Sequence, residues 1–129
     1  MDCLFCKIIE GSIPSNKVYE DSEVLVFLDI NPNTNGHMLI IPKKHLVTVD
    51  DVDSELAKHI LEVEKKMHTL LKEKLNIDGL TIVQNNDYGQ EVKHYHVHLI
   101  PRYENDCWKM NFRSDNLKDI KEIHNILTN

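Results

Sequence analysis

Apolar residues recur at two different spacings along the chain, and each spacing predicts its own kind of element. Between residues 53 and 75 they recur every three or four positions, with Lys and Glu between them. This spacing predicts one long amphipathic helix, for which Asp53 or Ser54 is a suitable N-cap. Shorter helical patterns predict a short N-terminal helix over residues 4–10 and a C-terminal helix over residues 114–127.

Short apolar runs bounded by turn residues predict strands in the rest of the chain. They cover residues 17–20, 24–28, 37–42, 80–83 and 92–100, and Pro101 is expected to end the last run. Short strands joined by short loops, with one long helix inserted, predict an α+β domain with an antiparallel sheet. Neither an internal repeat nor a Pro/Gly/Ser-rich linker divides the sequence. Residues 1–129 are therefore expected to form a single domain.

Composition and charge narrow the class of protein. The chain has 129 residues, of which 41% are hydrophobic and 28% charged, as is typical of a globular domain with its own core. The formal net charge of −6 argues against a protein that coats nucleic acid, but not against a small phosphorylated ligand. No apolar run approaches the roughly 18–20 residues of a membrane span, and the N-terminus lacks the features of a signal peptide. Three cysteines are an odd number, and a chain of this length needs no framework of disulfides. A reducing, cytoplasmic location is therefore expected.

The chain carries eight histidines, and three of them, His94, His96 and His98, alternate within the last predicted strand. Alternation places these three on one face of the strand and the apolar residues between them on the other, toward the core. Buried imidazoles need partners, so the row must share a ligand, a metal or a hydrogen-bond network. Two chemistries suit it: a zinc ion with an open fourth position, or nucleophilic attack by one imidazole while the others stabilise charge. Three further histidines on predicted helices have no motif support and are expected at the surface: His59, His68 and His124.

The segment His-Tyr-His-Val-His-Leu-Ile at residues 94–100 resembles the signature of the histidine triad (HIT) superfamily. Further matching segments follow the family's order and spacing: Phe27-Leu28-Asp29-Ile30, Gly36-His37, Ile41-Pro42-Lys43-Lys44-His45 and Gly89-Gln90. The resemblance covers residues 3–103, whereas the tail 104–129 is not matched. Within the superfamily the chain is most similar to bacterial, Hint-like nucleotide hydrolases. The resemblance implies a HIT-like fold, with a roughly five-stranded antiparallel sheet and one long helix, that pairs into a homodimer.

The resemblance also implies a reaction and the residues that perform it. HIT hydrolases cleave the bond at the α-phosphate of a substituted nucleotide, such as a nucleoside phosphoramidate or a dinucleoside polyphosphate, and release a nucleoside monophosphate. His96 corresponds to the nucleophile, which forms a covalent nucleotidyl-histidine intermediate. His98 and His37 correspond to histidines that contact phosphate oxygens, either protonated or as N–H donors, and His94 to one that orients its neighbours. The implied substrate is a purine nucleotide or dinucleotide, and no catalytic metal is expected.

Residues 27–30 match the part of the family site that binds the nucleoside. Asp29 corresponds to an acidic residue that accepts hydrogen bonds from the ribose hydroxyls, while Phe27 and Ile30 would form an apolar slot for the base. Each also has a structural interpretation from the sequence alone. Asp29 before Asn31-Pro32 is suited to cap a turn, and Phe27 and Ile30 are suited to a hydrophobic core.

The loop before the histidine row matches a segment that lies close to the phosphates or the ribose. Gly89 and Gln90 correspond to residues that contact phosphate oxygens, and Asn85 to an asparagine close to the phosphate or ribose. Glu91 departs from the pattern, because many eukaryotic relatives have Ser or Thr there. A carboxylate at this position would repel phosphates unless protonated or turned away, and with a raised pKa it would serve as a general acid.

Cys3 and Cys6 form a C-x-x-C pair. No pair of histidines follows at zinc-finger spacing, and the N-terminus lacks the βαβ context of a thioredoxin-like redox site. Resemblance to some bacterial HIT proteins implies instead a structural zinc ion held by Cys3, Cys6, His45 and His94, separate from catalysis. The alternative is a pair of reduced, partly buried thiols.

Two interpretations from other classes stay open. One is a zinc-dependent hydrolase in which the three alternating histidines are ligands of a zinc ion that holds a reactive water. In that case a chelator would abolish activity. The other is a nucleotide-binding adaptor or sensor without physiological turnover, whose binding would survive His96→Ala. The matches at Asp29 and Gly89-Gln90 favour a nucleotide over a bare metal site, but they do not separate an enzyme from a sensor.

Overall fold

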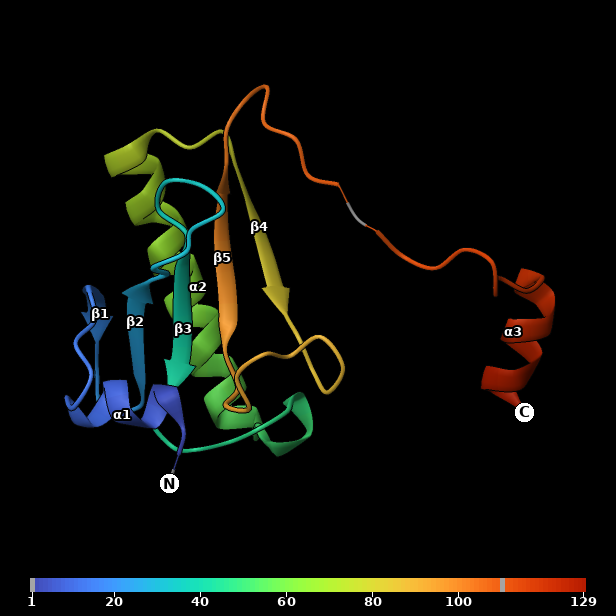
Figure 1. Ribbon diagram of the computed structural model, residues 1–129, viewed down its shortest axis with the longest axis horizontal. Coiled ribbons are helices and arrows are strands. Elements are labelled where there is room, and N and C mark those ends of the chain that lie inside the picture. Colours follow the sequence, from blue (N-terminus) through green and yellow to red (C-terminus); the bar gives the residue numbers. More distant parts are fainter. Residues whose placement is uncertain (1, 110) are drawn as a thin grey trace.

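A computed structural model describes residues 2–109 and 111–129, and its centre is a five-stranded antiparallel sheet with the order β1-β2-β3-β5-β4 (Figure 1). In chain order the elements are α1 (Leu4–Glu10), β1 (Lys17–Glu20), β2 (Val24–Leu28), β3 (Met38–Pro42), η1 (Val49–Asp51), α2 (Ser54–Leu75), β4 (Gly79–Gln84), β5 (Val97–Arg102) and α3 (Ile120–Thr128). The predicted α+β class and the antiparallel HIT-like sheet are confirmed.

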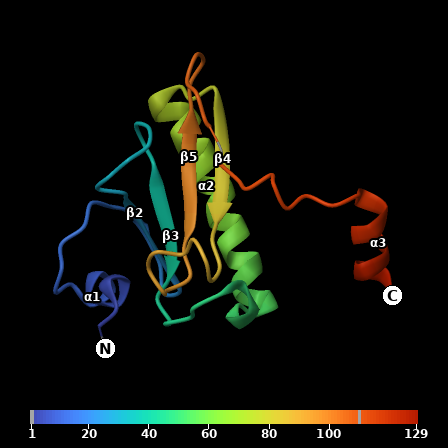
Figure 2. The same cartoon turned by 45° about the vertical axis from the view of Figure 1, so that its right-hand side comes forward.

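Helices lie on both faces of the sheet. The long helix α2 runs across one face, and the short helix α1 packs at the opposite face (Figures 1 and 2). Because successive side chains of a strand point to opposite faces, β2 sends Val24 and Val26 toward α2, and Leu25 and Phe27 toward α1. A strand that is covered on both faces has no polar side, which explains the continuous apolar run of β2.

Local signals at both ends of α2 explain its bounds. The side chain of Asp53 accepts a hydrogen bond of 2.9 Å from the N–H of Leu56, so it caps the helix as expected. Asn76 ends the helix in the left-handed conformation, with φ 51°. Between them, the apolar stripe buries four residues against the sheet: Ile60, Val63, Met67 and Leu71.

The predicted strand over residues 92–100 is wrong at its start, because β5 begins at Val97. His94 and His96 precede it in an irregular segment. The pairing of β3 with β5 stops where Ile40 faces Val97, although β3 continues to Pro42, and β4 ends opposite the same Val97 at Gln84. The N–H of Tyr95 donates instead to the carbonyl of Leu46, at 2.7 Å. The interleaved apolar residues are nevertheless buried, as the alternation predicts.

Pro101 does not end β5 as expected but pairs with Leu80 of β4. The first residue of β3, Met38, already faces Leu99, so Pro101 lies beyond the start of β3. Its carbonyl accepts the Thr34 hydroxyl at 2.7 Å on that side. The N–H and C=O of one residue in an antiparallel strand point to the same side. The N–H that Pro101 lacks would therefore point to the side of its carbonyl, where no strand needs a donor.

The C-terminal segment differs from the rest of the chain in its exposure. Every residue from 111 to 129 is exposed, and α3 lies apart from the sheet in both views (Figures 1 and 2). Asp119 caps α3 by accepting from the N–H of Lys121, so the helix begins later than the predicted residue 114. None of the helices among the described residues has the length and apolar character that crossing a membrane requires.

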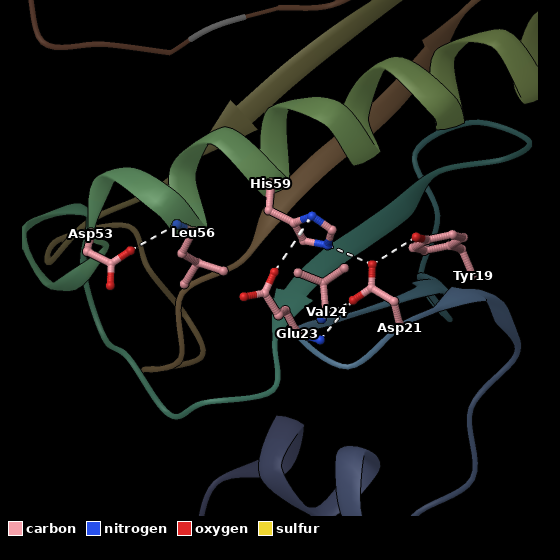
Figure 3. A network of polar contacts seen from close by, with 7 residues as sticks. All are labelled: Tyr19, Asp21, Glu23, Val24, Asp53, Leu56 and His59. Atoms are coloured by element: carbon pink, nitrogen blue, oxygen red, sulfur yellow. Dashed lines mark hydrogen bonds and ion pairs between the residues drawn. The ribbon is translucent and has the colours of Figure 1, made fainter.

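His59, which was expected at the surface, joins α2 to the turn between β1 and β2 (Figure 3). Its Nε2 lies 2.6 Å from Oδ2 of Asp21, and its Nδ1 lies 3.7 Å from the Glu23 carboxylate. Asp21 also accepts from the Tyr19 hydroxyl and from the N–H groups of Glu23 and Val24. Burial alone would raise the pKa of Asp21, but these hydrogen bonds outweigh it and hold the pKa well below its usual range.

Candidate active site and metal cluster

Four histidines meet on the α1 side of the sheet. His37 directly precedes β3, His94 and His96 precede β5, and His98 lies within β5. The ring centroids of His96 and His98 are 5.0 Å apart, and those of His37 and His98 are 5.2 Å apart. The first three histidines are buried and His98 is partly buried, so the hydrogen-bond partners of the rings decide what each nitrogen can do.

His96 has its tautomer set by the main chain. Its Nδ1 lies 2.7 Å from the backbone carbonyl of His94, and a carbonyl only accepts, so Nδ1 carries the proton. Nε2 is therefore left with its lone pair. Burial lowers the pKa of His96, and the ring of Phe5 packs edge-on at 5.0 Å. A buried neutral imidazole with one bare nitrogen is the form that can attack an electrophile.

His37 and His98 form a directed hydrogen-bond chain. The N–H of Asn33 donates to Nδ1 of His37 at 3.1 Å, so the proton of this ring lies on Nε2. That Nε2 lies 3.0 Å from Nδ1 of His98, which therefore accepts and leaves its own Nε2–H as the outward donor. Burial, with His96 and His37 close by, lowers the pKa of His98 to about 4, and burial lowers that of His37. Of the two forms considered from the sequence, the structure favours neutral N–H donors.

Asp29 lies beside this chain. Its Oδ1 accepts from the N–H of Asn31 at 2.9 Å, as expected of a turn cap, and its Oδ2 lies 3.7 Å from Nε2 of His37. Asp29, His37 and His98 place three potential metal ligands within 4.8 Å of one another. However, a ring that accepts an N–H at Nδ1 keeps its proton on Nε2, so His37 has no lone pair for a metal. The group is better suited to hydrogen bonding.

The two residues expected to contact the base lie in different surroundings. Phe27 is only 4% exposed and packs against Phe5, with ring centroids 5.7 Å apart. Phe27 therefore occupies a position in the hydrophobic core, which was the alternative to a contact with the base. Ile30, in contrast, is 82% exposed at the start of the loop after β2, so of the two it offers the larger apolar surface to a ligand.

The loop between β4 and β5 carries a buried amide. Gln90 is 4% exposed, and its Nε2 donates to the carbonyl of Val47 at 2.7 Å, while Oε1 has no hydrogen-bond partner among the described residues. Gly89 has φ 96°, a conformation that side-chain-bearing residues rarely adopt. Asn86 holds the loop by accepting from the N–H of Val49 at 2.8 Å, whereas the side chain of Asn85 makes no hydrogen bond within the described part of the chain. This leaves the side chain of Asn85 available for the ligand contact expected of it.

Cys3, Cys6, His45 and His94 bring four potential ligand atoms within 4.8 Å of one another. The Sγ of Cys3 lies 3.4 Å and that of Cys6 3.6 Å from Nδ1 of His94, and Cys6 lies 3.3 Å from Nδ1 of His45. Nε2 of His94 donates to the carbonyl of Pro42 at 2.8 Å, so its Nδ1 is bare and faces the sulfurs. Two thiols and two imidazoles are the donor set of a closed tetrahedral zinc site, so these residues fit zinc.

Local structure brings the two cysteines together. Cys3 is the N-cap of α1, and its sulfur accepts from the N–H of Cys6 at 3.3 Å. Burial and the neighbouring Cys3 raise the pKa of the Cys6 thiol to about 11, so deprotonation there requires a compensating cation. Glu91 is exposed and lines the hollow beside Cys3 and His45.

The alternating histidines thus serve two sites. His94 points its bare nitrogen at the cysteines, while His98 faces His37 and Asp29, and the candidate metal groups of the described residues never combine all three members of the row. This arrangement does not support a catalytic zinc ion on the whole row. His94 nevertheless connects the sites, because its ring faces the cluster while its backbone carbonyl accepts from His96.

Sequence reasoning missed two residues that set the histidine tautomers, Asn33 and Pro42. Both act through backbone atoms, one as an N–H donor to His37 and the other as a carbonyl acceptor for His94. No side-chain pattern could have pointed to them, because backbone groups are common to all residue types. Pro42 does lie within the segment that resembles the family, but its role follows only from the fold.

Comparison with known proteins shows the family to which the chain belongs. Residues 10–105 match the family model of the HIT domain. An uncharacterised HIT-like protein of Methanocaldococcus jannaschii is 48% identical over 124 residues, which span 94% of this chain and 95% of the relative. Adenylylsulfatase HINT3 of Arabidopsis thaliana is 36% identical over 98% of this chain and 66% of its own length. Adenosine 5′-monophosphoramidase HNT1 of Saccharomyces cerevisiae is 40% identical over 78% of this chain and 62% of its own length.

Solved structures are similar over most of the chain. A HIT family member from Bacillus subtilis has a TM-score of 0.82 at 41% identity, covering 98% of this chain and 93% of its own. A Zn-bound histidine triad family protein from Mycobacterium smegmatis has a TM-score of 0.78 at 37% identity, covering 98% and 91%. The matched domain, the shared fold and the arrangement of the histidines show that the chain belongs to the HIT family.

Proposed function

We propose that the protein is a nucleotide hydrolase or transferase that cleaves the bond at the α-phosphate of a nucleoside phosphoramidate or a dinucleoside polyphosphate. The product is a nucleoside monophosphate. The observation that carries this proposal is the pair of tautomers at the site, the bare Nε2 of His96 beside the Nε2–H donor of His98. Two relatives that are named as an adenylylsulfatase and an adenosine 5′-monophosphoramidase support the same reaction class.

In the first step, the lone pair on Nε2 of His96 attacks the α-phosphorus and forms an N–P bond. The bond to the leaving group breaks with its electron pair, and the leaving group takes up a proton. Positive charge develops on the ring, and the carbonyl of His94 stabilises it at Nδ1–H. In the second step, water attacks phosphorus and releases a proton, which balances the one that the leaving group took up. The N–P bond breaks, and its electron pair returns to Nε2. The two steps replace one difficult displacement by two easier ones.

Neighbouring residues hold the nucleotide for this reaction. The Nε2–H of His98 donates to a phosphoryl oxygen, and His37 keeps that donor in place. Oδ2 of Asp29 receives the ribose hydroxyls. The remaining residues proposed to contact the nucleotide lie near the end of β2, in the loop that follows it, and in the segment between β4 and β5: Phe27, Ile30, Asn85, Gly89, Gln90 and Glu91.

A structural zinc ion belongs to the same proposal, with Cys3, Cys6, His45 and His94 as its ligands. Their bare and ionisable donor atoms fit such an ion, and a Zn-bound relative of the same fold supports it. The metal would join the N-terminus to the segment before β5 and take no part in the reaction, which proceeds through His96 without a catalytic metal.

We also propose that two copies of the chain pair into a homodimer in the cytoplasm. β4 is an edge strand of the sheet, and its Ile82 is half exposed, which leaves both backbone groups and an apolar side chain to be covered. The C-terminal segment exposes a further set of apolar residues: Phe112, Leu117, Ile120, Ile126 and Leu127. Exposed apolar surface of this extent is typical of an interaction site, and sedimentation velocity would measure the assembly.

The deciding experiment measures AMP release from adenosine 5′-phosphoramidate and from diadenosine polyphosphate. Wild type, His96→Ala and the surface control His124→Ala are compared with and without a chelator. We expect release by wild type and His124→Ala that persists under chelation and vanishes in His96→Ala. Loss of release on chelation, with the fold intact by circular dichroism, would indicate a zinc hydrolase instead. Tight AMP binding without turnover of either substrate would indicate a nucleotide-binding protein and overturn the proposal.

A further inference from the structure

The loop over residues 29–36, between β2 and β3, is hydrogen-bonded to β5 and to the residue that follows β5. The hydroxyl of Thr34 donates to the carbonyl of Pro101 in β5 at 2.7 Å, and the Tyr103 hydroxyl donates to the carbonyl of Asn35 at 2.7 Å. The carbonyl of Thr34 also accepts the N–H of His37, at 3.1 Å. The conformation of this loop is therefore set by a strand more than sixty residues away as well as by its own turn.

This loop supplies the hydrogen bond that selects the tautomer of His37. The Asn33 N–H that donates to Nδ1 belongs to the residue next to Thr34, so the two groups move together. His37 is 3% exposed, so water is poorly placed to replace the donor if the loop shifts. Asp29 favours the same tautomer, but its Oδ2 lies 3.7 Å from Nε2, which is beyond a hydrogen bond.

The tautomer of His37 in turn determines what His98 presents to a ligand. With the proton on Nε2 of His37, Nδ1 of His98 accepts and its Nε2–H faces outward. If the proton of His37 moved to Nδ1, two lone pairs would oppose each other at the 3.0 Å contact. His98 would relieve this by carrying its own proton on Nδ1. Its bare Nε2 would then repel phosphate oxygens instead of binding them.

We propose that Thr34 is a positioning residue whose hydroxyl keeps both His37 and His98 in the Nε2–H tautomer. The effect of Thr34 on the rate rests on the proposed function, because the outward N–H of His98 affects the rate only if it binds a phosphoryl group. The effect of Thr34 on the tautomers does not depend on that function. Thr34 belongs to none of the motifs that mark the site in the sequence. It acts on the site through the Asn33 N–H and the two rings, not by touching the substrate.

The direct test is the tautomer of each ring, measured by long-range ¹H–¹⁵N correlation spectra at a single pH near neutrality. Thr34→Val removes the donor at nearly constant volume, Thr34→Ala removes it without any risk of overpacking, and Thr34→Ser keeps it. Thr69→Val, on the exposed face of α2, is the matched control. We expect the Nε2–H form of His37 and His98 in wild type, Thr34→Ser and Thr69→Val. An added Nδ1–H population is expected in the other two variants.

Kinetics on adenosine 5′-phosphoramidate provide the second readout. We expect kcat to fall about tenfold in Thr34→Val with KM little changed, less than the roughly 10²–10³-fold loss that removal of a whole charge-stabilising donor causes. Thr34→Ser should restore kcat. Wild-type tautomers in both Thr34→Val and Thr34→Ala, or Nδ1–H forms in Thr34→Ser, would overturn the proposal. If wild type releases no AMP, the proposed function fails, while the tautomer comparison still decides the role of Thr34.

Discussion

Gly36, the residue before His37, is predicted to tolerate no side chain. Its φ is 92°, and a Cβ placed there would lie 2.8 Å from Cδ1 of Leu75, 3.0 Å from Cδ2 of Leu71 and 3.2 Å from Cγ of Pro101. Leu75 is 43% exposed and can turn aside. Leu71 is buried against the sheet and Pro101 is held in β5, so neither can yield without moving its element. The substitution Gly36→Ala therefore combines backbone strain with overpacking.

The magnitude follows from these two contributions. A left-handed conformation costs an L-residue about 1–2 kcal/mol, and overpacking of a dense region costs about 1–3 kcal/mol, so Gly36→Ala should lower the free energy of unfolding by roughly 2–5 kcal/mol. Gly11→Ala is the matched control, because Gly11 has φ 88° and nothing lies within 4 Å of its added Cβ. It should lose only the backbone contribution, about 1–2 kcal/mol.

Urea unfolding followed by circular dichroism measures both variants under the same conditions. AMP release provides a second comparison, because a shift of Gly36 displaces the neighbouring His37, whereas Gly11 lies at the C-terminal end of α1 and is not a neighbour of His37 in the sequence. Equal losses of stability in the two variants would refute the argument, since the contacts with Leu71 and Pro101 would then contribute nothing.

Three further predictions concern charge and metal. Burial lowers the pKa of His96, and burial together with the neighbouring His96 and His37 lowers the pKa of His98 to about 4. The unfolded chain therefore binds more protons below pH ~6.5, so stability should fall from there toward pH ~4, with a smaller slope in His98→Asn by urea titration. An unchanged slope would contradict this. Plasma mass spectrometry should find about one zinc ion per chain in the wild type and none in Cys6→Ser. The variant should also unfold at a lower urea concentration, and equal zinc contents in both proteins would exclude the cluster. Asp21→Ala should lower the free energy of unfolding by about 2–3 kcal/mol, because it leaves several donors unpaired. The loss should exceed that of His59→Ala, and a smaller loss would count against the network.

The elements with strong local signals could be predicted closely from the sequence. The helical period and the cap at Asp53 predicted α2 to within one residue, because both ends depend on groups within one turn. The strands β1 and β2 were likewise expected at their observed bounds. The alternation after His94 predicted which residues are buried, although the strand begins only at Val97. Alternation survives in an extended segment whether or not a partner strand lies beside it.

Features that depend on distant partners could not be predicted. The start of β5 depends on where β4 ends and on where the pairing with β3 stops, and Pro101 is tolerated because it lies beyond the start of β3. The contact of His59 with Asp21 joins residues far apart in the sequence. The cysteine cluster was reached through family resemblance, since the spacing of Cys3 and Cys6 alone is a weak signal.

The tautomers of the site were also beyond the sequence. A row of three alternating histidines in the sequence does not show which nitrogen of each imidazole meets a carbonyl and which meets an N–H. In this chain the partners are the carbonyl of His94 for His96 and the N–H of Asn33 for His37. The motif led us to expect His96 as the nucleophile, but the reason why its Nε2 has a free lone pair appears only in the fold.

The central claim is that His96 becomes covalently bound to the nucleotide during the reaction. The most direct test mixes the protein with adenosine 5′-phosphoramidate, quenches it in alkali, which preserves N–P bonds, and measures the intact mass and the modified peptide. We predict that wild type gains one AMP group on the peptide that contains His96, and that His96→Ala gains none and releases no AMP. Release of AMP by His96→Ala at the wild-type rate, or an adduct on another residue, would contradict the account.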